Sequence, residues 1–230
     1  MNGNRAILMT GLLLVLTLAV FESTSLDLFV QDRLYDSVHG WVVDRNAPLP
    51  KLIFYNAPKF VMAGVSAILL LWIAVPASKS ARLPFSRREA VFLFVCLGLV
   101  PITVWALKKS TGVFGPWNVV RYGGLQPYRT LFHAIPFVAG QARGRGFPAA
   151  HCSGAFALMA LYFVGKGRTA RRFGFACGLV AGWIVGVYQI LKGAHYLSHT
   201  VVTMILAWLI VQLLARAFGL GGASPQDHAA

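Results

Sequence analysis

The stretch HTVVTMILAWLIVQLLARAF, residues 199–218, decides the class of fold. Its apolar run is long enough to cross a bilayer, because the hydrocarbon core requires about 20 residues of helix. Five earlier stretches have the same character, at residues 6–21, 57–75, 90–107, 150–164 and 173–191. The sequence therefore predicts an all-α polytopic membrane bundle of about six transmembrane helices.

The composition agrees with this fold class. The chain has 230 residues, of which 57% are hydrophobic and 12% are charged, and its mean hydropathy is +0.65. Soluble domains carry about 25% charged residues, so a water-soluble globule is excluded. We expect residues 1–220 to form a single membrane domain and residues 221–230 to be a disordered tail.

Two segments near the N-terminus need separate interpretation. Residues 6–21 follow Arg5 and are interpreted as an uncleaved first span, because no convincing cleavage site follows them. Residues 26–55 mix aromatic and charged side chains and end near Pro48 and Pro50. This mixture predicts an amphipathic segment that lies at the membrane interface.

The chain has a large positive charge, and its acidic residues are unevenly distributed along the sequence. The chain has 21 Lys and Arg against 7 Asp and Glu, and no carboxylate lies between residues 90 and 226. The cations of residues 78–88 and 166–172 predict cytoplasmic loops, which places both termini inside. Residues 108–149 and the junction around His195 are then outside, where their cations require an anionic partner. Nucleic acid is excluded as that partner, because no basic helix or aromatic platform lies in a soluble segment.

Three stretches meet at the predicted outer end of the bundle, at residues 107–124, 144–156 and 189–200. Each combines a cation or a histidine with Gly or Pro at the end of a span. His151 follows Pro148 where a span begins, so free backbone N–H groups would point at an anion there. His195 lies at the turn into the last span. Fixed positive charge, a nucleophile and a proton donor are what phosphoryl transfer requires, so the sequence predicts a phosphate-handling site.

The order of these motifs resembles that of a known family. A Lys-rich segment with an Arg, then Pro-x-x-His-x-Ser, then Gly-x-His-x-x-Ser is similar to the three-part signature of the type 2 phosphatidic acid phosphatase (PAP2) superfamily, in its membrane lipid phosphatase branch. The resemblance implies that His195 attacks phosphorus to form a phosphohistidine and that His151 is the general acid. It also implies that Lys108 and Arg121 bind phosphate. No metal is expected, because residues 90–226 contain no carboxylate to bind Mg²⁺, and no cofactor is expected.

The chain departs from the family pattern at four places, one of which is the stretched first motif, with Lys108 and Arg121 thirteen positions apart. Gln189 stands where the family has Arg, and His199 stands where it has Asp. The second motif reads Pro-Ala-Ala-His instead of Pro-Ser-Gly-His, so one hydroxyl donor is lost. We expect Lys192 to supply the cation that Gln189 lacks, and both residues to lie at the phosphate.

Other residues of these motifs have supporting or open roles. His199 lies four residues after His195, on the same helical face, and is expected to support it. Ser153 is expected to support the site as well. Arg143 and Arg145 can face either lipid headgroups or the substrate, and the sequence leaves this open.

The predicted function is hydrolysis or transfer of phosphate from a lipid phosphate or diphosphate, at the periplasmic or outer face of a bacterial-type inner membrane. Lipid A, a polyprenyl diphosphate, phosphatidylglycerol phosphate and phosphatidic acid all remain candidates, and the oligomeric state is undetermined. One alternative is a non-catalytic membrane protein of the same fold that binds anionic lipid. Another is a hydrolase of soluble phosphate esters, which would have a wide aqueous mouth.

Overall fold

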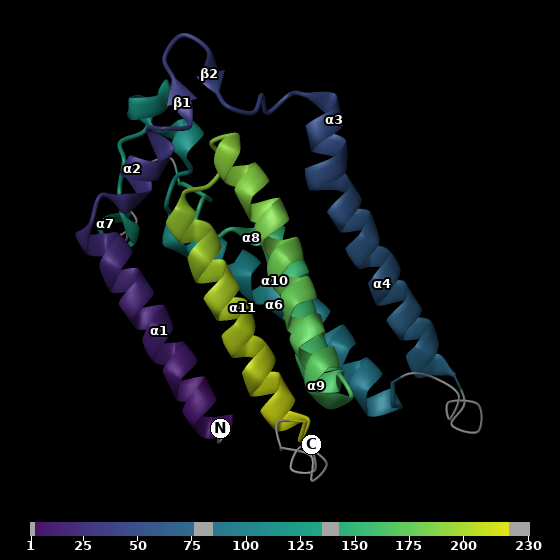
Figure 1. The fold of residues 1–230 in the computed structure, drawn as a ribbon. Coiled ribbons are helices and arrows are strands. Elements are labelled where there is room, and N and C mark those ends of the chain that lie inside the picture. Colours follow the sequence, from purple (N-terminus) through teal and green to yellow (C-terminus); the bar gives the residue numbers. More distant parts are fainter. Residues whose placement is uncertain (1–2, 76–84, 135–142, 221–230) are drawn as a thin grey trace.

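The computed structural model describes residues 3–75, 85–134 and 143–220. Its helices run side by side, and both chain ends lie at the same end of the bundle (Figure 1). The long helices are α1 (Gly3–Ser23), α4 (Ala57–Ala74), α6 (Arg87–Thr111), α10 (Gly167–Leu191) and α11 (Leu197–Ala217). Each belongs to a helical stretch that is long and apolar enough to span a membrane. The prediction of an all-α, multi-pass membrane protein is therefore confirmed.

The predicted span at residues 150–164 is the shortest of the set. It consists of α8 (Ala150–Ala157), the 3-10 turn η4 (Leu158–Ala160) and α9 (Leu161–Val164). This apolar run Ala150–Val164 is shorter than the roughly 20 residues that a full crossing requires. The short run is nevertheless held inside the bundle, because α6, α10 and α11 pack directly against α8.

Residues 26–55 form several short elements instead of one amphipathic helix. They comprise α2 (Leu26–Gln31), a hairpin of β1 (Tyr35–Asp36) and β2 (Gly40–Trp41), α3 (Pro48–Lys51) and the π-helical turn η1 (Leu52–Asn56). The hairpin turns tightly because the Asp36 carboxylate accepts hydrogen bonds from the N–H groups of Val38 and His39. Gly40 follows with φ +81°, a left-handed conformation that glycine adopts without strain. Helix α3 then starts at a proline and continues into α4.

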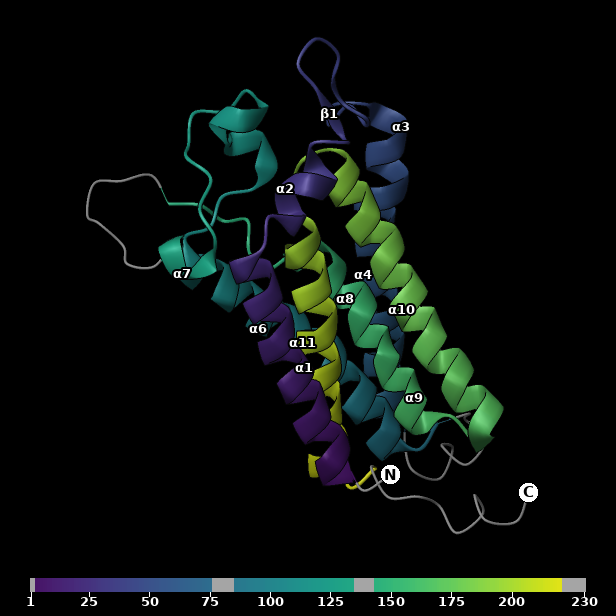
Figure 2. The same ribbon diagram turned by 60° about the vertical axis from the view of Figure 1, so that its left-hand side comes forward.

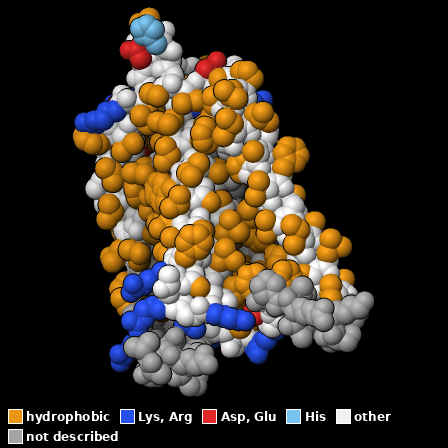
Figure 3. All heavy atoms as spheres, turned by 45° about the vertical axis from the view of Figure 1, so that its right-hand side comes forward, with side chains coloured by type: hydrophobic (Ala, Val, Ile, Leu, Met, Phe, Trp, Pro, Cys, Tyr) orange, Lys and Arg blue, Asp and Glu red, His pale blue; other side chains and the backbone are white. Residues whose placement is uncertain are grey.

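The outer surface carries the apolar side chains expected of a membrane protein. Figure 3 shows one face that is mostly hydrophobic, with Lys and Arg gathered near one end and acidic and His side chains at the hairpin tip. Exposed apolar side chains such as Leu71 near the end of α4 and Ile184 on α10 would contact lipid. Two of the predicted cytoplasmic cations, Lys79 and Arg82, and the predicted disordered tail at residues 221–230 lie outside the described residues.

The remaining described elements connect the spans at the end of the bundle opposite the termini. They are η2 (Pro116–Asn118), η3 (Val120–Tyr122) and α7 (Leu131–Ala134). Helix α6 begins with a capping box between Ser86 and Glu89 and ends at Gly112, whose φ is +70°. The cation-rich starts of α6 and α10 lie at the end that carries both termini (Figure 1).

Helix α10 approaches its neighbours closely through four glycines spaced four residues apart: Gly174, Gly178, Gly182 and Gly186. A Cβ added at position 178 would lie 2.2 Å from the Met159 backbone nitrogen. One added at position 182 would lie 2.1 Å from the Phe156 ring, and one at position 186 would lie 2.4 Å from the Thr200 methyl group. Small residues at this spacing let helices in a membrane pack at backbone contact. The stripe therefore fixes the distance of α10 from α8, η4 and the start of α11.

This packing predicts the effect of adding one methyl group. Gly178→Ala should destabilise the protein by about 1–3 kcal/mol, because the new Cβ overlaps backbone that cannot move aside. Gly98→Ala on α6 is the matched control, because nothing lies within 4 Å of its added Cβ. Thermal unfolding in detergent, followed by tryptophan fluorescence, measures both variants. Equal melting temperatures for the two variants would contradict this account of the packing.

Candidate active site

Three histidines form a row at the end of the bundle opposite the chain termini. The Nδ1 atom of His151 lies 3.4 Å from Nε2 of His195, and Nδ1 of His195 lies 3.4 Å from Nδ1 of His199. His195 and His199 are both 2% exposed. The structure thus brings together the predicted nucleophile, the predicted general acid and the histidine that replaces the family's Asp.

The turn between α10 and α11 positions His195. The N–H groups of Ala194 and His195 both donate to the Gln189 carbonyl, which caps the end of α10. Gly193 makes the reversal with φ +72°, so a side chain there would be strained. The nucleophile candidate therefore sits on a fixed backbone between two long helices.

Glycines bring the other two motifs against this turn. The Gly144 N–H donates to the Gly112 carbonyl and the Gly146 N–H donates to the Val113 carbonyl, so the two connecting segments run side by side. A Cβ added at position 115 would lie 2.4 Å from the Ala194 carbonyl oxygen. All three motifs meet because their backbones can touch.

His151 lies in the first turn of α8. The N–H of Ala149, the residue just before the helix, donates to Thr203 Oγ1 and to the His199 carbonyl, which ties the start of α8 to α11. The first backbone N–H groups of any α-helix lack partners within the helix. That such groups at the start of α8 hold a phosphate stays a prediction.

Two adjoining cavities meet at His151. A polar chamber of about 300 Å³ lies over His195 and is lined by residues of all three motifs, among them Trp117, Asn118 and Arg143. A lateral groove of about 450 Å³ opens between α4 and α6 and has an apolar floor that includes Met62 and Trp105. The two cavities share three residues: Lys108, Arg145 and His151. A molecule with an anionic head and an apolar tail would fit both at once.

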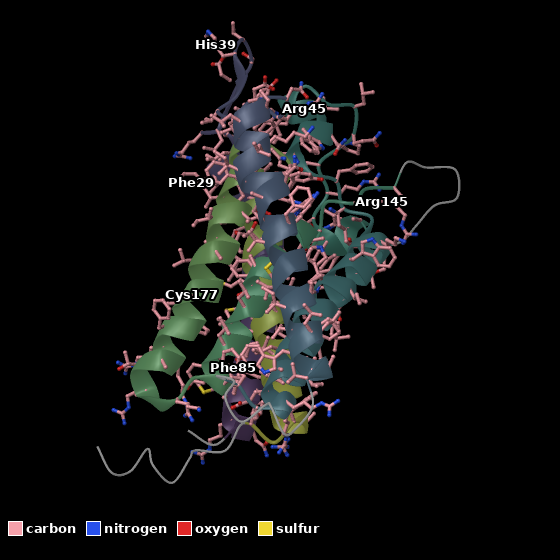
Figure 4. The ribbon with its side chains drawn as sticks, turned by 90° about the vertical axis from the view of Figure 1, so that its right-hand side faces the viewer. Phe29, His39, Arg45, Phe85, Arg145 and Cys177 are labelled. Atoms are coloured by element: carbon pink, nitrogen blue, oxygen red, sulfur yellow. The ribbon has the colours of Figure 1, made fainter. Side chains whose placement is uncertain are left out.

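Several cations surround His151. Lys108, Lys192 and Lys59 are its nearest charged groups, and they come from three different parts of the chain. Lys59 Nζ lies 3.4 Å from the Tyr55 ring centroid, and that ring lies 5.0 Å from the His151 ring. Arg145 lies in the same half of the molecule as the hairpin residue His39, whereas Phe85 lies near the opposite end (Figure 4). The positive charge is thus concentrated at the histidine end of the groove.

Burial changes the protonation of the two site residues on the α10–α11 turn. Lys192 lies 4.9 Å from the Tyr55 ring centroid and 4.6 Å from that of Tyr188, and burial together with Lys51 and Lys59 lowers its pKa to about 8. Burial is the main reason that the pKa of His195 lies well below its ordinary value. The neighbouring His199, His151 and Lys108 lower this pKa further. A neutral imidazole keeps a free lone pair, which a nucleophile needs.

Of the predicted site residues, Lys108, His151 and His195 line the two cavities, and the others, Lys192 and His199 included, do not. Arg121 forms a bidentate ion pair with Asp32, at 2.8 and 2.7 Å, and lines neither cavity. Ser153 Oγ donates to the Ala150 carbonyl inside α8. Gln189 is buried, and both polar atoms of its side chain lack hydrogen-bond partners among the described residues. Their roles at the phosphate stay predictions.

The segment at residues 26–43 clamps the α10–α11 turn. The Asp27 carboxylate accepts hydrogen bonds from the N–H and the hydroxyl of Ser198, in the first turn of α11. Gln31 donates to the Ile190 carbonyl, and the Trp41 ring covers the Gly193 backbone. Acidic partners for the second half of the chain therefore come from the first half. A count of charges in the second half alone could not reveal these partners.

Sequence reasoning did not identify Lys59 or Asp27 as parts of the site. A lone lysine inside an apolar span was the available signal for Lys59, because such a charge is costly in a membrane and usually functional. Asp27 gave no comparable signal, because its partner Ser198 is 171 positions away in the sequence.

A multi-pass bundle with histidines and cations from three ordered motifs at one end defines a class of membrane phosphate-handling proteins. The comparisons agree: residues 89–220 match the PAP2 superfamily, and the chain belongs to this superfamily. A comparison with curated protein sequences finds no match.

One solved structure has a similar fold. It is the crystal structure of the first transmembrane PAP2 type phosphatidylglycerolphosphate phosphatase from Bacillus subtilis. The identity is 14% and the TM-score is 0.53, and the alignment covers 92% of this chain and 94% of the other. At this identity the likeness supports the fold alone, and it extends over the N-terminal segments that lie outside residues 89–220.

The clamp on α11 predicts a role for Asp27. Burial raises its pKa to about 6, so the carboxylate is ionised at neutral pH and holds Ser198 with two charge-assisted bonds. Asp27→Ala should cost about 1.5–3 kcal/mol of stability. It should also lower kcat about tenfold, because the His195 turn would shift. Asp27→Asn should lose less, since its amide oxygen can still accept from the Ser198 N–H.

Asp44→Ala is the control for this experiment, because Asp44 is exposed and bonds only within its own turn in the described structure. Melting temperature and steady-state kinetics on a lipid phosphate measure all three variants. If Asp27→Ala behaved like Asp44→Ala in both assays, the clamp would have no influence on the site.

Proposed function

We propose that the protein is a metal-independent lipid phosphatase that cleaves a phosphate monoester or diphosphate through a phosphohistidine on His195, at the extracytoplasmic face of the membrane. Membership of the PAP2 superfamily supports a phosphatase. A lipid substrate is supported by the pair of adjoining cavities, one polar and one apolar, that share His151 and Lys108.

The lateral groove favours a lipid over a soluble ester. Its floor is apolar, and it opens between α4 and α6, where a substrate can enter from the bilayer with its tails in place. Trp105 and Tyr55 hold Lys109 and Lys59 at the rim by cation–π contacts of 3.5 and 3.4 Å. A soluble ester would gain nothing from the apolar floor, since hydrophobic burial scales with the apolar area removed from water.

The first chemical step uses both histidines. The Nε2 lone pair of His195 attacks phosphorus, an N–P bond forms, and the P–O bond to the lipid breaks. A protonated His151 gives its proton to the leaving oxygen, so that the lipid departs as an alcohol. The side chains of Lys108 and Arg145 and the first-turn N–H groups of α8 stabilise the charge on the phosphoryl oxygens.

The second step releases phosphate. A water molecule in the polar chamber attacks the phosphohistidine, its proton goes to His151, and the N–P bond breaks. An acceptor alcohol in place of water would make the same site a phosphotransferase. His199 lies against Nδ1 of His195 through both steps and limits rotation of the imidazole.

The two histidine roles predict different mutant behaviour. His195→Ala should reduce turnover to the uncatalysed level and leave no phosphoenzyme, because the nucleophile is gone. His151→Ala should lower kcat by about 10²–10⁴-fold on an alkyl phosphate. On a substrate whose leaving group needs no proton, such as an aryl phosphate, this loss should largely disappear.

Phosphate release in detergent with EDTA present, together with mass spectrometry after an acid-free quench, measures these outcomes. Near-normal turnover by His195→Ala, or a phosphoryl group on His199, would contradict the assignment. Wild-type protein that binds lipid phosphates but never releases phosphate would favour the non-catalytic alternative.

The lowered pKa of Lys192 predicts an alkaline limb in the pH profile. Lys192 is charged below its pKa of about 8, so its attraction for phosphate is present at pH 7 and is lost as the pH rises through about 8. Wild-type kcat/KM should therefore fall above pH 8. Lys192→Arg keeps its charge and should move this limb to higher pH. Lys192→Met should lower kcat/KM below pH 8 to the level that the wild type reaches at high pH, and so remove the limb. An unchanged limb in Lys192→Met would exclude Lys192 as its cause.

A further inference from the structure

A second groove lies at the opposite end of the bundle from the histidines. It has a volume of about 870 Å³ and runs between α1, α9 and α11, near both chain termini. These helices lie side by side in both ribbon views (Figures 1 and 2). Leu12, Leu13 and Leu16 form one wall, and the packed rings of Phe163 and Trp208 form the floor. A lipid acyl chain is the natural occupant of a trough with these walls in a membrane.

The groove also contains polar groups at one end. Gln212 is 7% exposed, and its buried Oε1 atom has no hydrogen-bond partner among the described residues. Arg216 lies one helical turn further toward the end of the bundle and bonds Asn4 of α1. Arg88 is nearby, because a Cβ added at Gly219 would lie 2.6 Å from its guanidinium nitrogen. Gln212 and Arg216 thus line the terminal end of an apolar trough, and the Arg88 guanidinium group approaches Gly219, another lining residue, from α6.

The charge at this end lacks an acidic partner in the described structure. Neither Arg88 nor Arg216 forms an ion pair with the described carboxylates, and the neighbouring Glu89 is engaged in the capping box with Ser86. An anionic group bound between the two arginines would be held by charge-assisted hydrogen bonds.

The spacing of these groups matches a phospholipid. Gln212 lies about 6 Å deeper along α11 than Arg216, from the helical rise of 1.5 Å per residue. In a phospholipid the phosphate comes first, the ester carbonyls lie one step deeper, and the acyl chains follow. The Gln212 amide, turned about its last bond, can donate its N–H to an ester carbonyl, and the two ends of such an amide are interchangeable by rotation.

We propose that this groove binds one anionic phospholipid, with its phosphate between Arg216 and Arg88, an ester carbonyl at Gln212 and an acyl chain along α1. The lipid is drawn from the leaflet opposite to the histidines and is not a substrate. It links α1 to α9 and α11, so its binding stabilises the bundle. The site is independent of the proposed phosphatase activity, because it shares no residue with either catalytic cavity.

Native mass spectrometry of the purified full-length protein tests this site, with phosphatidylglycerol or phosphatidylcholine as the added probe. The wild type should retain one phosphatidylglycerol after delipidation and bind phosphatidylcholine at least tenfold more weakly. Arg216→Ala should weaken phosphatidylglycerol binding about tenfold, and Leu13→Trp, which fills the trough, should abolish it. Leu71→Trp is the matched control, because Leu71 is an exposed leucine on α4 away from the groove.

Added phosphatidylglycerol should also raise the melting temperature of the wild type and of Leu71→Trp, but not that of Leu13→Trp. Three results would each overturn the proposal: retention of the lipid by Leu13→Trp, equal binding of both lipids, or capture of phosphatidylglycerol only after removal of residues 221–230. The last result would identify the chain's own end as the occupant. The experiment measures lipid binding and melting temperature. Its outcome therefore does not depend on whether the protein proves to be a phosphatase.

Discussion

The backbone contact between α10 and the short α8–α9 run governs the positions of the other parts. Four glycines allow this contact, and one of them, Gly186, extends it to Thr200 at the start of α11. The end of α10 carries the turn with His195, and the start of α8 carries His151. If the helices stood apart by the width of one methyl group, the two imidazoles would no longer lie 3.4 Å from each other. Close helix packing inside the membrane-spanning bundle therefore sets the distance between two polar side chains at the end of the bundle.

The site is completed by parts of the chain that precede the family-matched residues 89–220. Asp27, Gln31 and Trp41 fix the α10–α11 turn from above, while Tyr55 and Lys59 extend the cationic rim along the lateral groove. These contributions explain how a chain with altered motifs can keep an ordered site. Lys192 and Lys59 both bring positive charge to bear on His151, while the replacement of the family's cation at position 189 by Lys192 stays a prediction.

Much of the fold could be predicted from the sequence, because membrane insertion depends on local runs of apolar residues. The predicted spans correspond to helices within a few residues, and His151 and His195 could be singled out because each stands at a span end beside Gly or Pro. Arg121 illustrates what could not be predicted: its pairing with Asp32 depends on a fold that joins residues 89 positions apart. The hairpin at residues 35–41 was missed for a different reason. Its turn depends on an Asp36 side chain that bonds its own backbone, and this competes with helix formation.

The shortness of the Ala150–Val164 run has a further consequence for the depth of the reaction. At 1.5 Å per residue this run spans about 22 Å, against a hydrocarbon core of about 30 Å. Either one end of the run therefore lies inside the hydrocarbon core, or the core is thinner beside it. For the proposed reaction at His151, either the substrate lowers its phosphate below its neighbours in the leaflet or the leaflet thins around the protein. Such a recess selects lipids by the bulk of what lies beyond the phosphate, because a wide headgroup cannot descend between the helices.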